Sequence, residues 1–159
     1  MKINIDFRST NYVEKVLSNL QPCNFVFLDQ QCASVEGVLQ SLKFSNIDKQ
    51  KSIIKLSGFP AKFAGKNVPY SLLNWFGFRF DRHSQTYQDF INELLFCSIS
   101  QCDIRKNAII NSKGFVLSHD IGCDDANKTI LTKTEFITNL NDIRFEILKQ
   151  HEKLPDWLT

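Results

Sequence analysis

The stretch SVEGVLQSLKF, residues 34–44, decides the fold. Serine is favoured just before a helix, and the apolar residues after it are spaced three and four apart. They are Val35, Val38, Leu39 and Leu42. We therefore predict a helix that begins after Ser34 and buries this face in the core. Glu36, Gln40 and Lys43 share the opposite face, at positions i, i+4 and i+7.

Taken alone, this polar face has two interpretations. Charged and amide side chains at helical spacing usually form an ordinary solvent-exposed face. The functional interpretation is a site built on Glu36 and Lys43. Gly37 weakens the first turn of the helix, and close approach of a ligand, of another backbone or of packed side chains would explain it.

Around this helix, the sequence predicts more helices and a few short strands. Apolar patterns predict strands at 2–7, 24–28 and 115–117. Apolar spacing and capping residues predict helices at 48–57 (ending at Gly58), at 60–64, from Ser84 onward, at 103–111 and after the capping box TKTE at 132–135. The aromatic-rich segment 67–82 shows no regular pattern. We predict a helix-rich α+β fold with a small β-sheet, forming a single domain over residues 1–159.

Composition and charge exclude several classes of protein. The chain is 43% hydrophobic and 23% charged, which excludes disordered, collagen-like and coiled-coil proteins. Polar residues interrupt every apolar run before the roughly 20 residues of a membrane span, and the first ten residues lack the apolar centre of a signal peptide. We expect a soluble cytoplasmic protein. A net charge of +2 argues against a dedicated nucleic-acid binder but leaves room for a phosphorylated ligand.

Cysteine and histidine spacing predicts neither disulfides nor a metal site. The five cysteines include no C-x-x-C pair and are expected to be reduced thiols. His83, His119 and His151 lack the clustering that a zinc site needs. We expect no metal and no cofactor.

Three blocks of the sequence resemble the NADAR domain, also called the YbiA-like family. They are IDFRST at 5–10, LSNL at 17–20 and SVEGVLQSLKF at 34–44, where the family reads F-Y-S, F-S-N-F and S-E-H-x-x-x-x-x-K-F at similar spacing. LSHDIG at 117–122 and NDIR at 141–144 fall where the family has its second signature and its terminal helix. The chain departs from the family at Val35, an insertion after the serine, at Gly37, which replaces the usual histidine, and in residues 119–127, which lack a Trp-Gly pair.

The resemblance implies an N-glycosidase. Some members act on phosphorylated riboflavin-pathway intermediates, and others remove ADP-ribose from guanine. Glu36 matches the family's glutamate, Lys43 its lysine, Ser18 and Asn19 its loop polar pair, and Trp75 its tryptophan. We hypothesise hydrolysis of an ADP-ribosyl or phosphoribosyl compound. Because the Trp-Gly pair is absent, we favour ADP-ribosylated guanine, as a base or within nucleic acid.

The residue types suit this chemistry. Breaking an N-glycosidic bond builds positive charge on the anomeric carbon, which a carboxylate stabilises. The positive end of the helix favours ionised Glu36, so we expect it to act as a base or by its charge rather than as a general acid. Lys43 either binds phosphate as an ammonium group or, with a lowered pKa, attacks the opened sugar aldehyde to form a Schiff base.

The other ligand-binding candidates have structural alternatives. Asn19 binds a ribose hydroxyl or is a turn residue, and Trp75 stacks on a base or packs in the core. His119 and Asp120 shape the pocket or pair with each other. Ser18 and Gln40 complete the predicted ligand-binding set. The rival function is a non-catalytic protein that sequesters an ADP-ribose-derived nucleotide.

Overall fold

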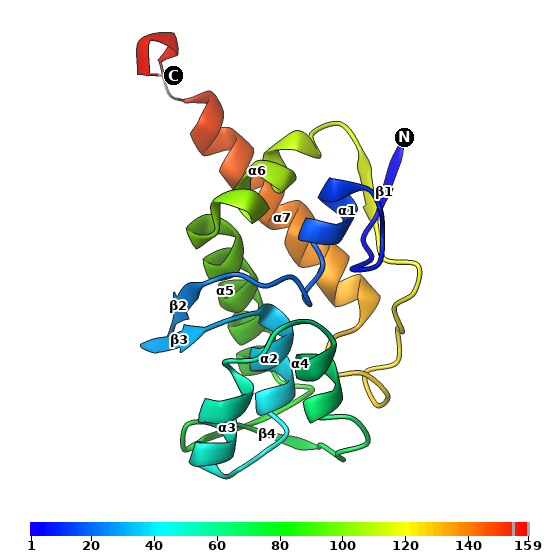
Figure 1. Cartoon of the computed structure of the whole chain (residues 1–159), viewed down its shortest axis with the longest axis vertical. Helices are drawn as coiled ribbons and strands as arrows, with labels where there is room; N and C mark the ends of the chain where they lie inside the picture. Colours follow the sequence, from blue (N-terminus) through cyan, green and yellow to red (C-terminus); the bar gives the residue numbers. More distant parts are fainter. Residues whose placement is uncertain (154, 159) are drawn as a thin grey trace.

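The computed structural model describes residues 1–153 and 155–158, and its α+β architecture agrees with the prediction (Figure 1). In chain order the elements are β1 (Lys2–Asn4), α1 (Tyr12–Val16), β2 (Phe25–Phe27), β3 (Gln30–Cys32), α2 (Val35–Ser41), α3 (Ile47–Ile53), α4 (Gly58–Ala64), β4 (Leu72–Trp75), β5 (Phe78–Asp81), α5 (Gln85–Gln101), α6 (Asp103–Asn111), β6 (Val116–Ser118), α7 (Lys133–Glu152) and the 3₁₀ turn η1 (Asp156–Leu158). Helix α1, strand β3, the hairpin β4–β5 and the turn η1 are the described elements that the sequence did not predict.

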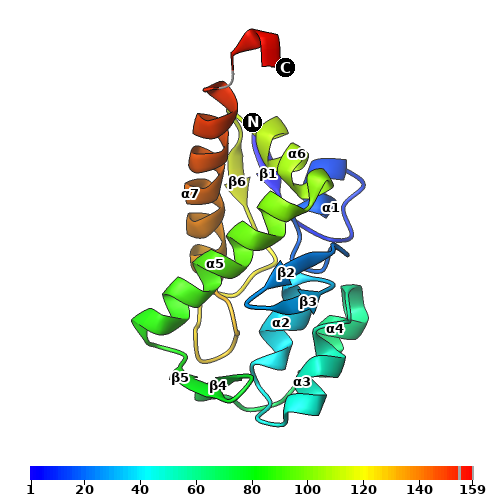
Figure 2. The same cartoon turned by 90° about the vertical axis from the view of Figure 1, so that its left-hand side faces the viewer.

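Three helices, α5, α6 and α7, pack against one another in one half of the molecule (Figure 2). The Ser84 side chain caps α5, and Thr132 with Glu135 forms the predicted capping box of α7. The face of α7 that points into the core consists of the predicted residues Phe136, Leu140, Ile143 and Ile147. Helices α2, α3 and α4 form a second group at the other end (Figure 1).

Each of the three sheets has two strands, among the residues described. Strands β1 and β6 are parallel and bring together segments far apart in the sequence, with Ile3 opposite Leu117. The Ile5 N–H extends this pair by donating to the Ser118 carbonyl at 2.8 Å. Strands β2 and β3 form a hairpin that packs on α5.

The prediction of irregular structure at 67–82 is wrong, because β4 and β5 form an antiparallel hairpin there. Phe76 and Gly77 connect the strands with positive φ angles of 44° and 93°. Hairpin turns of this kind usually carry Asn-Gly or Asp-Gly, so a phenylalanine in the turn hides the signal. Each strand is also only four residues long, too short for its alternation to mark a strand in the sequence.

Helix α2 lies so close to the end of α3 and the residues after it that their backbone leaves no room for a side chain at Gly37. A side chain at Gly37 would place its Cβ 2.8 Å from the Leu56 carbonyl oxygen and 2.9 Å from that of Ile53. The predicted helix 48–57 ends early, at Ile53, and Gly58 begins α4 with a φ of 61° instead of stopping the preceding helix.

Candidate functional site

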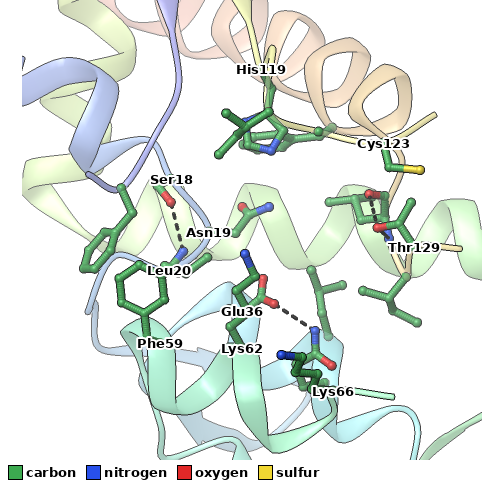
Figure 3. Close-up of a pocket in the computed structure, with 18 of the residues that line it drawn as sticks. Ser18, Asn19, Leu20, Glu36, Phe59, Lys62, Lys66, His119, Cys123 and Thr129 are labelled. Atoms are coloured by element: carbon green, nitrogen blue, oxygen red, sulfur yellow. Dashed lines mark hydrogen bonds between the residues drawn. The ribbon is translucent and has the colours of Figure 1, made fainter. Parts of the chain in front are cut away.

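A cavity of about 690 Å³ opens between α2, α4 and three loops (Figure 3). The loops follow β1, α1 and β6, so segments far apart in the sequence form the walls of the cavity. In Figure 3, His119 lies on one side and Glu36 with Lys66 on the opposite side. The predicted site residues that line this cavity are Ser18, Asn19, Glu36, Gln40, Lys43 and His119.

Glu36 lies in the wall of the cavity and is 9% exposed, so the polar face of α2 is not an ordinary solvent-exposed face. Its backbone N–H donates to the Asn19 carbonyl at 2.9 Å, and its Oε1 accepts a hydrogen bond from Gln40 Nε2 at 2.8 Å. Burial raises the pKa of Glu36, although the hydrogen bond from Gln40 and the charges of Lys62, Lys43 and His119 act in the opposite direction.

This raised pKa differs from our expectation for Glu36. The positive end of α2 favours the ionised carboxylate, but the loss of water around a buried carboxyl group outweighs it. A carboxyl group with a raised pKa can hold a proton closer to neutral pH, so the geometry does not restrict Glu36 to a role as a base.

Lys43 is half-buried just beyond the C-terminal end of α2. Its ammonium group donates to the Gly65 carbonyl at 3.0 Å and lies over the Tyr70 ring, 5.2 Å from its centroid. Burial lowers the pKa of Lys43, opposed by the charge of Glu36. The amine form is therefore easier to reach than in an exposed lysine, as nucleophilic attack requires.

A buried arginine holds the loop that carries Ser18 and Asn19. Arg105 is 0% exposed, and its Nη1 donates to the carbonyls of Val16 at 2.8 Å and Ser18 at 2.7 Å. The Ser18 hydroxyl accepts a hydrogen bond from the Leu20 N–H at 3.2 Å. Asn19 Oδ1 is buried without a hydrogen-bond partner among the described residues, so this acceptor is available to a ligand.

His119 follows β6 and has a defined tautomer when neutral. Its Nδ1 lies 2.8 Å from the Ile5 carbonyl, which only an N–H group can satisfy, so Nε2 carries the lone pair. The ring packs edge-on against Phe136, with 5.3 Å between centroids. Asp120, by contrast, is not among the lining residues: it forms an exposed ion pair with Lys2 at 2.6 Å. The prediction that Asp120 binds ligand is therefore corrected.

Trp75 also lies away from the cavity. It is 5% exposed and packs in the core with Phe27, Phe76 and Phe90, at ring-centroid distances of 5.4, 4.7 and 5.6 Å. The core interpretation is correct, because strand β4 turns this side chain toward β2 and α5. Trp75 therefore has no ring face available for stacking on a ligand.

The sequence analysis missed a group of aromatic and basic residues on α4 and the loops. Phe59 and Phe63 are partly exposed at the cavity and stack with 5.9 Å between centroids. The cationic side chains that line the cavity are Arg8, Lys43, Lys62, Lys66 and Lys128, against two carboxylates, Asp6 and Glu36. Phenylalanine and lysine pairs at i, i+4 in FPAKFAGK were the available signal.

Residues 1–153 and 155–158 contain neither a cluster of metal-binding side chains nor a helix able to span a membrane. No group of three or more histidine, cysteine, aspartate or glutamate side chains there is placed to hold a metal ion. No helix in the described part of the chain combines the length and the apolar character that crossing a membrane requires.

The fold of the chain is the YbiA-like fold. Its structure is similar to the NMR structure of YbiA from E. coli, with a TM-score of 0.64 over 98% of this chain and 91% of YbiA, at 13% sequence identity. This likeness shows the fold that the resemblance implied.

The sequence assigns the chain to a narrower family. Residues 11–145 match the family model of bacteriophage protein GP30.3, so the chain belongs to that family. It is also 35% identical over 133 residues to the "Uncharacterized 17.1 kDa protein in Gp30-rIII intergenic region" of Enterobacteria phage T4. That match covers 80% of this chain and 88% of the phage T4 protein.

Proposed function

We propose that this protein is an N-glycosidase that hydrolyses the N-glycosidic bond of an ADP-ribosyl or phosphoribosyl compound, with ADP-ribosylated guanine as the preferred substrate. The observation that carries this proposal is the placement of Glu36 and Lys43 in one cavity. Burial raises the pKa of Glu36 and lowers that of Lys43. Carboxyl and amine groups perturbed in this way are typical of sites that move protons or attack carbonyl groups.

The charge of the cavity supports a phosphorylated ligand. Five cationic side chains and two carboxylates line it, an excess of positive charge larger than the +2 of the whole chain. Neither Lys62 nor Lys66 forms an ion pair with a described carboxylate. A pyrophosphate beside these two lysines would pair with them without displacing a carboxylate.

The hydrogen-bonding groups near Glu36 support a sugar. The Oδ1 of Asn19, a residue that lines the cavity, is a buried acceptor without a partner among the described residues. Glu36 supplies a further acceptor, since the hydrogen bond from Gln40 occupies only its Oε1. Ribose hydroxyl groups are donors that suit such acceptors. Phe59 and Phe63, rather than Trp75, then offer aromatic faces to the base.

In the proposed reaction, the bond between the anomeric carbon and the base nitrogen breaks as positive charge develops on the sugar. Ionised Glu36 stabilises that charge and orients the water that adds to the anomeric carbon. The water loses a proton, and the departing base gains one. Lys43 has two alternative roles: its ammonium group binds phosphate, or its amine forms a Schiff base with the opened sugar.

The test is incubation with ADP-ribosylated guanosine, with release of ADP-ribose followed by chromatography. We expect release by the wild type, and a loss on the order of a hundredfold or more in Glu36→Gln. Asp120→Asn is the matched control, because its carboxylate lies outside the cavity. Borohydride added during turnover leaves a covalent adduct on Lys43 if the Schiff base forms, and no adduct if Lys43 only binds phosphate.

Absence of turnover of ADP-ribosylated guanosine would refute the preferred substrate, and absence of turnover of phosphorylated riboflavin precursors as well would refute the glycosidase proposal. Phosphorylated riboflavin precursors would then be tested in the same assay. Tight binding of ADP-ribose in calorimetry, without product from any of these compounds, would establish the alternative, a protein that sequesters an ADP-ribose-derived nucleotide. If Glu36→Gln changes neither binding nor turnover, the cavity is not the functional site.

A further inference from the structure

Gly65 lies against two of the site side chains, and its backbone does not explain why it is a glycine. It ends α4 with a φ of −108° and a ψ of 12°, a conformation that residues with side chains also adopt. The side chains of Gln40 and Lys43 leave no room for a side chain at residue 65. A Cβ at residue 65 would lie 2.1 Å from Gln40 Oε1 and 3.1 Å from both Gln40 Cδ and Lys43 Cδ.

The same residue also contacts Lys43 through its backbone. The Gly65 carbonyl accepts the hydrogen bond from Lys43 Nζ at 3.0 Å. The amide of Gln40 has its Oε1 next to the Gly65 Cα and donates from Nε2 to Glu36 Oε1 at 2.8 Å. Gln40 is only 6% exposed, so its amide is confined between Glu36 and the bare Cα of Gly65.

We propose that Gly65 is a positioning residue, which seats the amide of Gln40 against Glu36 and the ammonium group of Lys43 at the cavity wall. The inference rests on the proposed function of Glu36 and Lys43, and it adds a residue just after α4 that is not among those lining the cavity. One glycine thereby sets the placement of both site groups, through its missing side chain and through its carbonyl oxygen.

The proposal distinguishes Gly65→Ala from an ordinary destabilising substitution. The group in the way of the new methyl is the end of a flexible side chain, which can swing aside, whereas backbone cannot. We therefore expect Gly65→Ala to fold with an unfolding midpoint near that of the wild type. Its effect is confined to the hydrogen bond between Gln40 and Glu36 and to the stem of Lys43.

The first measurement is the titration of the Glu36 carboxyl carbon by NMR, which needs no substrate. The hydrogen bond from Gln40 lowers the pKa of Glu36 against the effect of burial. Gly65→Ala is therefore expected to move the Glu36 titration to higher pH, and Gln40→Ala is expected to do the same. In the double variant the methyl meets no amide and only the Lys43 stem, so the Glu36 titration should shift by less than the sum of the two single shifts.

The second measurement is turnover of ADP-ribosylated guanosine as a function of pH. If the proposed function holds, Gly65→Ala loses on the order of a hundredfold in turnover, and its pH profile moves in the direction of the NMR titration. An unchanged Glu36 titration in Gly65→Ala overturns the positioning role, as does a double variant shifted by the sum of the two single shifts. If the Glu36 titration shifts as expected but neither the wild type nor any variant turns over substrate, the glycosidase function is refuted. The role of Gly65 in positioning Gln40 against Glu36 is then still supported.

Discussion

Replacing Gly37 with alanine tests the contact between α2 and α3, and the structure fixes the expected cost. The new Cβ would lie 2.8 Å and 2.9 Å from two carbonyl oxygens and 3.2 Å from the Ser34 hydroxyl that caps α2. Overpacking of this kind costs about 1–3 kcal/mol, and disturbing a cap costs about 1 kcal/mol. Alanine favours the helix over glycine by about 1 kcal/mol, which offsets part of this loss of stability. We therefore expect a net loss of about 2 kcal/mol, equivalent to a melting temperature lower by about 4–8 °C.

The assay is unfolding in urea, with the midpoint and the slope measured for each variant. Gly37→Ala should lower the midpoint with an unchanged slope. Gly65→Ala is the matched control, because the closest atom there belongs to a movable side chain and its free energy of unfolding should stay within about 1 kcal/mol of the wild type. A Gly37→Ala variant as stable as the wild type would refute the reasoning, since it would show that the α2–α3 contact yields at little cost.

Three further predictions concern stability. Because burial raises the pKa of Glu36 above its value in the unfolded chain, wild-type stability falls as pH rises through the folded-state pKa. Glu36→Gln should therefore gain stability over the wild type with rising pH in urea unfolding, and a pH-independent difference would contradict this. Burial by itself would raise the pKa of Glu135. The hydrogen bonds that its carboxylate accepts, of which the one from Arg82 has the largest effect, outweigh burial and lower the pKa. Glu135→Gln should lose about 3 kcal/mol at pH 7, a loss that shrinks as acid protonates the wild-type carboxyl; equal losses at pH 3 and pH 7 would be the contrary result. Trp75→Phe should lose about 2 kcal/mol of stability and keep its affinity for ADP-ribose in calorimetry, whereas a tenfold weaker affinity would return Trp75 to the site.

The long elements were predictable because each carries several turns of apolar spacing, and α5 and α7 also carry a capping side chain. Helix α6 has the predicted bounds, and α7 has the predicted capping box. Helix α1, strand β3 and the β4–β5 hairpin have three to five residues per element, too few for a period to be recognised. Their positions depend on contacts with distant segments, which no local pattern encodes.

The site was predictable where one helix carries the residues and less so where loops do. Glu36, Gln40 and Lys43 were predicted together because helix geometry places them on one face. This face borders a cavity because α4 packs near it. Lys62 on α4 and Lys66 just after it also line the cavity, and the sequence did not predict either of them as a site residue. His119 lines the cavity and Asp120 does not, because the Ile5 carbonyl holds the first and Lys2 attracts the second to the surface.

The parallel pairing of β1 with β6 has a consequence for synthesis of the protein. Strand β1 leaves the ribosome well before its partner β6, which lies more than a hundred residues later in the sequence. The position of the His119 ring depends on the same early segment, because the Ile5 carbonyl contacts its Nδ1. Pairings between such distant segments form late in folding because closing the intervening loop costs entropy. A nascent chain that ends before residue 116 thus carries Glu36 and Lys43 but lacks the opposite wall of the cavity. The site is assembled only when most of the chain has emerged, so a stalled or truncated product has no complete cavity in which to bind a ligand.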